Sequence, residues 1–372
     1  MSRAPHILHV FSTFTNGGPQ VRTCSILNAL GPAFTHTIMA TDGNYDAANR
    51  IGSQVSCRFL PPPKGKGSLL YAFALGQVFR RLRPDAAFTY NWGSFDAILA
   101  VRALGLCPIV HTEDGFGKDE AAGLKKRRIW ARRAVLNATH AVVVPSRTLR
   151  QISTGAYGLK DSKVRFIPNG VDLSRFQPGD QNSEWRRRFQ IPEEAVLTGY
   201  VGRLSPEKNL SLLLEAFAQA DVANTRLAIV GEGPCRSELE QLSAKLGLRG
   251  RIVFTGPVAD PAGCYRALDV FAMSSHTEQM PMALLEAMAS GLPAVCTDVG
   301  DTAEMLGAGW PVLVPSGATG RYAEALRIMT TSPGLRSRLG VHNRKRCEEE
   351  YSFDRMLNRY AGLFGETAGA AC

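Results

Sequence analysis

Short apolar runs alternate with longer segments of helical period along the first 170 residues. Each run is bounded by turn residues and is long enough for a buried strand, and the segments between runs are long enough for crossover helices. The runs lie at residues 6–11, 36–41, 55–60, 86–91, 108–113, 141–145 and 164–168. Strands that alternate with helices form a parallel sheet covered by helices. The pattern therefore predicts a doubly wound α/β domain over residues 1–170.

This alternation stops after residue 170 and starts again at residue 196. Residues 171–195 carry turn signals and no sustained strand period, which indicates an interdomain linker. Strand runs then follow at residues 196–202, 226–231, 251–256, 270–275, 293–299 and 310–315. We therefore predict a second Rossmann-like domain over 196–345 and a helical tail over 346–372. The chain is expected to be helical from residue 319 onward, with a break near Ser332-Pro333. A solenoid is excluded because no period of about 40 residues repeats.

Positive charge is concentrated in the first predicted domain. Residues 1–170 hold 22 Lys and Arg against 9 Asp and Glu, a net charge of +13, and the remaining residues hold 21 against 24, a net charge of −3. Such a surplus on one domain favours contact with nucleic acid or anionic lipid. We expect no nucleic-acid partner, because no nucleic-acid-binding module is recognisable.

Other features of the sequence bear on the protein's location. No apolar run approaches the roughly 18 residues of a membrane span. The first residues, MSRAPHILHVF, lead directly into a predicted strand without the pattern of a signal peptide. The eight cysteines show no CxxC or Cys/His spacing of a metal site. We therefore expect a cytoplasmic protein with reduced, buried thiols and no metal site.

The segment TEQMPMALLEAMASGLP is the first candidate for a binding site. Pro281 suits the first position of a helix, and Gly291 suits the left-handed residue after its end. Glu278 then lies in the loop before the helix, and Glu286 lies in its second turn. Such a loop lies at the carboxyl edge of a parallel sheet, where a helix N-terminus can bind phosphate and carboxylates can accept from sugar hydroxyls. The pair favours a nucleotide sugar, although two glutamates around a helix start are more often structural.

Two further loops carry groups that suit a diphosphate. GYVGRLSPEKNL places Arg203 and Lys208 between the first strand of the second domain and the next helix. Two cations at this spacing can hold a diphosphate, because the planar guanidinium of arginine can form two parallel hydrogen bonds and the ammonium of lysine lies on a flexible side chain. In TNGGPQ, Gly17 and Gly18 follow the first strand, and their backbone N–H groups could approach an anion. A plain tight turn is an equally good interpretation of the two glycines.

One histidine is a candidate for chemistry in the first domain. His111, in IVHTEDG, lies at the carboxyl end of a predicted strand, where it could reach the ligand-binding edge. A lone histidine is more often structural. The adjacent Glu113 and Asp114 could also be catalytic, but adjacent acids in a loop are usually solvated.

Two kinds of cofactor site are not made by this sequence. In VGEGPC the third glycine of a dinucleotide fingerprint would fall at Arg236, and no acidic residue closes a convincing second strand. There is also no DxD motif to hold a divalent ion on a diphosphate. Arg203 and Lys208 could supply that positive charge instead, so we expect neither NAD nor a metal, and no other cofactor.

In chain order, these segments resemble the retaining GT-B glycosyltransferases of the large GT4 family. The resemblance covers nearly the whole chain and is carried by the GG loop, VHTEDG, VVVPS, IPNGVD, GRLSPEKN, VGEGP, FTG and EQMPMALLE. GRLSPEKN and EQMPMALLEAMASGLPAV together are its most specific part. The resemblance implies a GT-B fold: two Rossmann-like doubly wound domains that face a cleft, with a C-terminal helix that returns to the N-terminal domain.

The resemblance also implies roles for individual residues. Arg203 and Lys208 would hold the donor diphosphate, and Glu286 would bind the ribose hydroxyls. Glu278 and His111 would contact the donor sugar near its reacting centre, which makes these two and the two cations the catalytic set. Further donor contacts would come from Gly17, Gly18, Met280, Pro281 and Met282. Gln279 departs from the glycine of many relatives and leaves the sugar's identity open.

The implied activity is retaining, metal-independent transfer of a sugar from a nucleoside-diphosphate sugar. The acceptor would attack from the face that the diphosphate leaves, and positive protein groups that stabilise the negative leaving group would supply most of the catalysis. The acceptor would be a lipid, a lipid-linked saccharide or a growing polysaccharide of the cell envelope. A soluble small-molecule acceptor, a nucleotide-sugar 2-epimerase and a non-catalytic nucleotide-binding protein remain alternatives.

The segment KKRRIWARR bears on where the acceptor lies. Its charges spread nearly all round a helix, so it is not a helix with one apolar face, and a solvated basic helix is an equally good interpretation. The net charge of +13 on the acceptor-side domain favours a membrane role, with Trp130 as an interfacial anchor. We therefore predict a peripheral protein on the cytoplasmic face of the inner membrane. The predicted surface consists of Lys125, Lys126, Arg127, Arg128, Trp130, Arg132 and Arg133.

Overall fold

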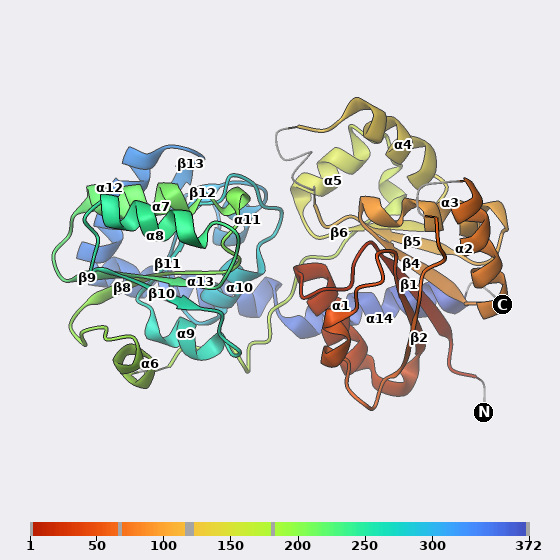
Figure 1. The fold of residues 1–372 in the computed structure, drawn as a ribbon, viewed down its shortest axis with the longest axis horizontal. Helices are drawn as coiled ribbons and strands as arrows, with labels where there is room; N and C mark the ends of the chain where they lie inside the picture. Colours follow the sequence, from red (N-terminus) through yellow and green to blue (C-terminus); the bar gives the residue numbers. More distant parts are fainter. Residues whose placement is uncertain (1–2, 66–68, 116–122, 180–182, 370–372) are drawn as a thin grey trace. The chain divides into compact units, whose positions relative to one another are not determined.

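The computed structural model describes residues 3–65, 69–115, 123–179 and 183–369, which divide into two units (Figure 1). Unit 1 comprises Met1–Pro168 together with Met356–Cys372, and unit 2 comprises Asn169–Arg355. Each unit contains its own parallel sheet, as the two series of apolar runs predict.

Unit 1 has a seven-stranded sheet in the order β3-β2-β1-β4-β5-β6-β7, with all neighbouring pairs parallel. Its strands are β1 (His6–Phe11), β2 (Thr35–Ala40), β3 (Ser56–Leu60), β4 (Ala86–Tyr90), β5 (Ile109–Thr112), β6 (Ala141–Val144) and β7 (Val164–Phe166). Its helices are α1 (Gly18–Leu30), α2 (Leu69–Leu82), α3 (Phe95–Ala103), α4 (Lys126–Leu136), α5 (Arg147–Thr154) and most of α14 (Phe353–Gly369). Short 3-10 turns are η1 (Gly31–Ala33), η2 (Asp46–Arg50), η3 (Trp92–Ser94) and η5 (Asp161–Lys163).

The two faces of this sheet are covered by different helices because successive side chains of a strand point to opposite sides. Leu8 and Val10 of β1 belong to a buried cluster with α2 and α3. His9, between them, faces the other way and lies against Phe364 of α14, with ring centroids 6.0 Å apart. Helices on both faces explain why the strands of this unit read as continuous apolar runs.

Unit 2 has a six-stranded parallel sheet in the order β10-β9-β8-β11-β12-β13. Its strands are β8 (Val196–Val201), β9 (Thr225–Val230), β10 (Ile252–Gly256), β11 (Val270–Met273), β12 (Ala294–Asp298) and β13 (Leu313–Pro315). Its helices are α6 (Ser183–Arg188), η6 (Pro206–Lys208), α7 (Leu210–Ala220), α8 (Arg236–Lys245), α9 (Ala262–Ala267), α10 (Met282–Ala289), α11 (Thr302–Leu306), α12 (Thr319–Thr331) and α13 (Pro333–Glu350). Figure 1 shows α7, α8 and α12 on one face of this sheet and α9 on the other.

The strand order reverses once in each sheet, between β1 and β4 in unit 1 and between β8 and β11 in unit 2. Open parallel sheets bind ligands at the carboxyl ends of the strands beside such a reversal, because the loops on either side diverge there. His111 lies within β5, one residue before its carboxyl end, and the loops that follow β1, β8 and β11 carry Gly17, Lys208 and Glu278, respectively. Each therefore starts from the ligand-binding edge of its own sheet.

The predicted linker, residues 171–195, belongs to unit 2 instead of separating two domains. Within it lies α6, whose Arg186 is buried. The Arg186 guanidinium donates to the carbonyls of Ala267 and Ala195 at 2.9 and 3.0 Å and pairs with Asp269 at 2.7 Å. These contacts attach α6 to the loop between α9 and β11. The pattern of apolar residues in the sequence does not predict them.

The helical tail divides between the two units. Ahead of this tail, the helical region from residue 319 onward breaks at Ser332, between α12 and α13, as the Ser332-Pro333 pair predicts. Residues up to Arg355 belong to unit 2, and those from Met356 onward belong to unit 1. The predicted return of the C-terminal helix to the N-terminal domain is therefore confirmed.

Among the residues that the structure describes, no helix is both long enough and apolar enough to cross a membrane.

Candidate functional site

The loop between β8 and α7 presents the two predicted cations. Arg203 is exposed, and its carbonyl accepts a hydrogen bond from Tyr200 Oη at 2.9 Å, which holds the loop close to the strand. Lys208 ends the 3-10 turn η6 and is partly buried. The neighbouring loop can pack against this one because position 231 is glycine: a Cβ there would lie 1.8 Å from the carbonyl oxygen of Gly202. The glycines of VGEGP thus serve loop packing.

Glu278, in the loop between β11 and α10, meets Lys208 directly. Lys208 Nζ lies 2.5 Å from Glu278 Oε1, and Ser275 Oγ donates to the same oxygen at 2.8 Å. The side chains of Lys208 and Glu278 are 24% and 12% exposed, so the pair is only partly screened by solvent. The structure therefore brings together two residues for which the sequence predicted contacts with one substrate.

Neighbouring loops hold the Glu278 loop from both sides. On one side, the His276 N–H donates to the Glu207 carbonyl at 2.8 Å. On the other, the Asp301 N–H donates to the Gln279 carbonyl at 2.9 Å. Gly300 has φ +56° and a Cβ there would lie 2.3 Å from the carbonyl oxygen of Glu278, so only glycine fits this close approach. The loop backbone is thus preset before any ligand binds.

The helix after this loop begins one residue later than predicted. Pro281 is the N-cap of α10 instead of its first helical residue, and Met282 is the first. The Met280 carbonyl accepts from Asn169 Nδ2 at 2.9 Å. Gly291 has φ +74° as predicted, and the following residue, Leu292, donates its N–H to the Ala287 carbonyl at 3.0 Å, which closes the helix end.

Glu286 lies on α10 with a partner that the sequence analysis missed. Tyr265 Oη donates to Glu286 Oε2 at 2.8 Å from the buried helix α9. Burial raises the pKa of the Glu286 carboxyl to about 7, and the hydrogen bond from Tyr265 acts in the opposite direction. Because α9 and α10 approach only in three dimensions, no local motif marks this tyrosine.

His111 lies at the end of β5 in unit 1, with its side chain fully buried. Its Nδ1 lies 2.9 Å from Thr89 Oγ1, and its ring meets the edge of Phe95 at a centroid distance of 5.3 Å. Its Nε2 lies 3.7 Å from Glu113 Oε2. The tautomer of His111 determines the direction of its hydrogen bond with Thr89, because the Thr89 hydroxyl can donate to Nδ1 or accept from it.

The acids beside His111 are buried instead of solvated, which corrects the expectation for adjacent loop acids. Glu113 Oε2 accepts from Arg132 Nε at 3.1 Å, with side-chain exposures of 0% and 1%. Asp114 Oδ1 pairs with Arg22 Nη1 at 2.6 Å, with exposures of 6% and 5%. Each charge was visible in the sequence, but the pairings join residues far apart along the chain.

Gly17 and Gly18 lie at the start of α1, and their roles differ. Gly17 is the N-cap, and a Cβ there would lie 2.6 Å from Gln20 Oε1. Gln20 is itself held by a hydrogen bond from its Nε2 to the Thr13 carbonyl at 2.9 Å. A Cβ at Gly18 would meet nothing within 4 Å. The N-terminal turn of α1 therefore keeps an open backbone at Gly18, which suits the approach of an anion.

The basic segment forms α4 and divides into inward and outward residues. Arg132 is buried against Glu113 and the Trp92 ring, which removes it from the predicted membrane surface. Lys125 and Arg128 are half-buried, and Arg128 also lies over Trp92 at 4.9 Å. The outward residues are Lys126, Arg127, Trp130 and Arg133. The sequence places charges nearly all round the helix, but the exposed ones lie with Trp130 on one face. Lys126, Trp130 and Arg133 share this face because consecutive members are three or four residues apart.

Unit 2 therefore combines a lysine, two carboxylates and a helix N-terminus at one sheet edge. This set can neutralise a diphosphate and accept hydrogen bonds from hydroxyl groups. Unit 1 contributes a buried histidine and two arginine–carboxylate pairs at the edge of its own sheet.

Comparison with known proteins finds similarity along both units. The family described as glycosyl transferases group 1 matches residues 181–346, and that described as glycosyltransferase family 4 matches residues 16–175. A D-inositol 3-phosphate glycosyltransferase of Geodermatophilus obscurus is 31% identical over 77% of this chain and 68% of the relative. The protein of the same description from Actinosynnema mirum is 29% identical over 76% and 72%.

Solved structures share the fold at low sequence identity. Sucrose-phosphate synthase from Thermosynechococcus elongatus superposes with a TM-score of 0.84 over 98% of this chain and all of that one, at 20% identity. Anabaena HepE in complex with UDP gives a TM-score of 0.81 over 97% of this chain and 100% of that one, at 18% identity.

Proposed function

The chain belongs to family 4 of the glycosyltransferases and has their two Rossmann-like domains, and from this premise we propose that it is a retaining, metal-independent sugar transferase. It moves a sugar from a nucleoside-diphosphate sugar to a hydroxyl of a lipid, a lipid-linked saccharide or a growing polysaccharide. The observation that carries this proposal is the Lys208–Glu278 pair beside the start of α10.

The pair suits departure of a nucleoside diphosphate. As the bond between the anomeric carbon and the diphosphate oxygen breaks, negative charge builds on the leaving group. Lys208, Arg203 and the N–H groups at the start of α10 can stabilise that charge, and Lys208 and the helix start are already held in place before the reaction. Glu278, whose carboxylate already lies on Lys208 Nζ, accepts from the sugar hydroxyls on the same side.

Glu286 would receive the ribose of the donor. Tyr265 occupies one of its carboxylate oxygens, and the other remains for a hydroxyl. Because a buried helix supplies the tyrosine, the carboxylate is oriented before the nucleotide arrives. His111 of unit 1 would contact the transferred sugar near its anomeric centre, and the acceptor hydroxyl would then attack from the face that the diphosphate leaves.

A donor screen tests the proposed transfer. The protein is incubated with UDP-, GDP- and ADP-sugars, first in buffer and then with membrane extract as acceptor, and release of nucleoside diphosphate is measured. We expect one nucleotide class to be turned over and the extract to raise its rate, with the anomeric configuration retained in the product. A product with inversion at C2 of the donor sugar and no transfer would indicate an epimerase instead.

We expect transfer to proceed without a divalent metal. The sequence lacks a DxD motif, and protein cations take the place of the ion. Excess EDTA should therefore leave the initial rate of the identified reaction unchanged. A rate that collapses with EDTA and returns with Mg²⁺ or Mn²⁺ would show that the diphosphate needs a metal after all.

The outward face of α4 supports a membrane-associated acceptor. Trp130 is 69% exposed and Arg133 lies over its ring at 5.9 Å, so an aromatic anchor and cations share one surface. Each basic side chain near an anionic bilayer adds about 1 kcal/mol of attraction, which makes a few of them sufficient for reversible binding at low salt. We therefore place the protein at the cytoplasmic face of the inner membrane.

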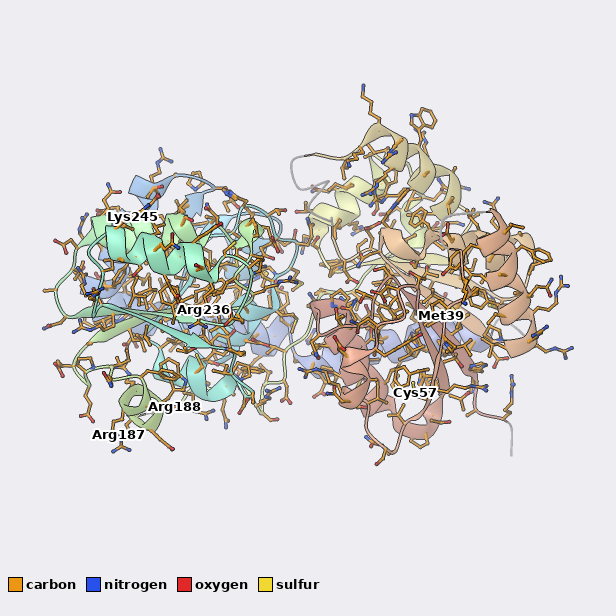
Figure 2. The ribbon with its side chains drawn as sticks, in the orientation of Figure 1. Met39, Cys57, Arg187, Arg188, Arg236 and Lys245 are labelled. Carbon is orange, nitrogen blue, oxygen red and sulfur yellow. The ribbon has the colours of Figure 1, made fainter. Side chains whose placement is uncertain are left out.

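Liposome co-sedimentation tests this surface. The parent protein should pellet with anionic vesicles more than with neutral ones, and neutralising Lys126, Arg127 and Arg133 should abolish the difference. The matched control neutralises three exposed cations of unit 2, Arg187, Arg188 and Lys245, which lie on α6 and α8 (Figure 2). Equal pelleting with both vesicle types, or equal loss in the control, would favour a soluble acceptor.

A further inference from the structure

The carboxyl end of β5 and the segment after it keep several buried polar atoms for which the described residues supply no partner. Glu113 Oε1, Asp114 Oδ2 and His111 Nε2 have no hydrogen-bond partner among the residues that the structure describes. A buried polar atom without a partner is unfavourable and uncommon in folded proteins. Three of them within four residues, at the ligand-binding edge of a parallel sheet, indicate a place where a ligand supplies the missing partners.

In Glu113 and in Asp114, one carboxylate oxygen is paired with an arginine and the other has no partner among the described residues. Arg132 takes Glu113 Oε2 at 3.1 Å, and Arg22 takes Asp114 Oδ1 at 2.6 Å. The backbone is fixed as well, because the Asp114 N–H donates to Asn91 Oδ1 at 2.7 Å. Rotation of either carboxyl group would break its ion pair, so Glu113 Oε1 and Asp114 Oδ2 keep their positions.

His111 is an independent sign that this cluster meets a ligand. Its side chain is fully buried, and Nδ1 is occupied by Thr89 Oγ1 at 2.9 Å. Its Nε2 is directed at the carboxylate cluster, 3.7 Å from Glu113 Oε2, which is too far for a hydrogen bond. A group that donates hydrogen bonds could satisfy the imidazole and the carboxylates together.

The chemistry of the unpartnered atoms selects the kind of ligand. A carboxylate oxygen can only accept hydrogen bonds, so it requires donors such as hydroxyl groups. A phosphate also consists of acceptors, so it does not supply the hydrogens that these two oxygens lack. The relatives from G. obscurus and A. mirum are named for a phosphorylated acceptor, inositol 3-phosphate. Glu113 Oε1 and Asp114 Oδ2 are instead suited to an acceptor that presents hydroxyl groups at this position.

We propose that Glu113 and Asp114 form an acceptor subsite that binds the hydroxyl groups of a neutral sugar or polyol and rejects a phosphate group at that place. This inference rests on the proposed transfer reaction and narrows its acceptor. Arg22 and Arg132 act as positioning residues, because each fixes one carboxylate. The unpartnered oxygens then distinguish hydroxyl from phosphate.

The first test compares neutral and phosphorylated acceptors with the unmodified protein. Release of nucleoside diphosphate from the identified donor is measured with glucose, mannose and myo-inositol, and with glucose 6-phosphate, mannose 6-phosphate and inositol 3-phosphate. At least one neutral compound should raise the rate, and its phosphorylated counterpart should be at least about tenfold less effective. Stimulation by the phosphorylated set alone, by both sets equally or by neither set overturns the proposal.

The second test separates acceptor binding from donor binding. Glu113→Gln and Asp114→Asn should each raise the KM for the neutral acceptor by about tenfold or more and leave the KM for the donor unchanged. Asp269→Asn is the matched control, since it weakens another arginine–carboxylate pair of 2.7 Å, in unit 2, in which Arg186 is buried and the Asp269 side chain is 17% exposed. If both variants fold and neither changes the acceptor KM, water satisfies these oxygens and the subsite is refuted.

Failure of the underlying reaction would give a different result. In that case no nucleotide sugar would release nucleoside diphosphate, even with membrane extract present. Thermal unfolding of each variant accompanies the kinetics, because loss of a buried ion pair can also prevent folding. The comparison of neutral and phosphorylated acceptors uses the parent protein, so it tests the proposed subsite even if a variant does not fold.

Discussion

Replacing Lys208 with alanine is expected to lower the rate of sugar transfer by about two to three orders of magnitude. A preorganised positive charge beside the leaving group contributes on the order of 2–4 kcal/mol to transition-state stabilisation, and each 1.4 kcal/mol is a factor of ten. Arg203→Ala should have an effect of similar size. The measurement is kcat for the donor identified by the screen, with product formation followed directly.

The contact between Lys208 and Glu278 calls for a control. Removing the lysine leaves the Glu278 carboxylate partly buried without its cation, so part of the loss could come from a displaced loop. Arg203 is exposed and tests the phosphate role without that complication. Lys245→Ala removes an exposed lysine of the same unit and should change neither rate nor stability (Figure 2). Parental turnover in both Arg203→Ala and Lys208→Ala would refute the phosphate assignment.

Phe364→Ala should destabilise unit 1 by about 3–5 kcal/mol, the range for truncating a buried aromatic side chain. Phe364 is 2% exposed and lies against Phe88 and Phe34, with ring centroids 4.6 and 5.5 Å apart. The cavity would open between α14 and the sheet, where the C-terminal helix closes one face of the core. Chemical denaturation monitored by circular dichroism should show an earlier transition for this unit.

The control for Phe364 lies on the same helix. Glu366 is half-exposed and meets His140 and Arg165 at 3.3 and 3.6 Å on the surface. Surface ion pairs of this kind contribute at most about 1 kcal/mol, so Glu366→Ala should leave the transition nearly unchanged. If Phe364→Ala unfolds like the parent protein, the C-terminal helix contributes little to the stability of unit 1.

Expected and observed strands agree in order and differ at some of their ends. The first apolar run was expected at residues 6–11, and β1 spans His6–Phe11. The run at 164–168 is shorter in the structure, where β7 ends at Phe166. The Ile167 N–H still donates to the Val144 carbonyl at 3.0 Å, but Pro168 has no N–H with which to continue the ladder.

The sequence predicted on which loop or helix each residue of the candidate donor site lies, but it did not predict the contacts between these residues. Arg203, Lys208, Glu278 and Glu286 were selected from loop position and residue type, and each lies on the predicted loop or helix. Tyr265 was missed because its partner lies on another helix, and an isolated tyrosine in an apolar segment has no distinguishing pattern.

The sequence by itself determined two parallel sheets, the helix break at Ser332 and the loops that carry the candidate residues. These properties follow from local rules, because the period of apolar residues and the conformational limits of proline and glycine act over a few residues. Tertiary structure alone decided that residues 171–195 join unit 2, that Arg132 turns inward to Glu113 and that Lys208 meets Glu278. The reason is that burial and charge pairing depend on which residues the completed sheets bring into contact. A charged side chain carries the same letter in the sequence whether it lies in water or against a buried carboxylate.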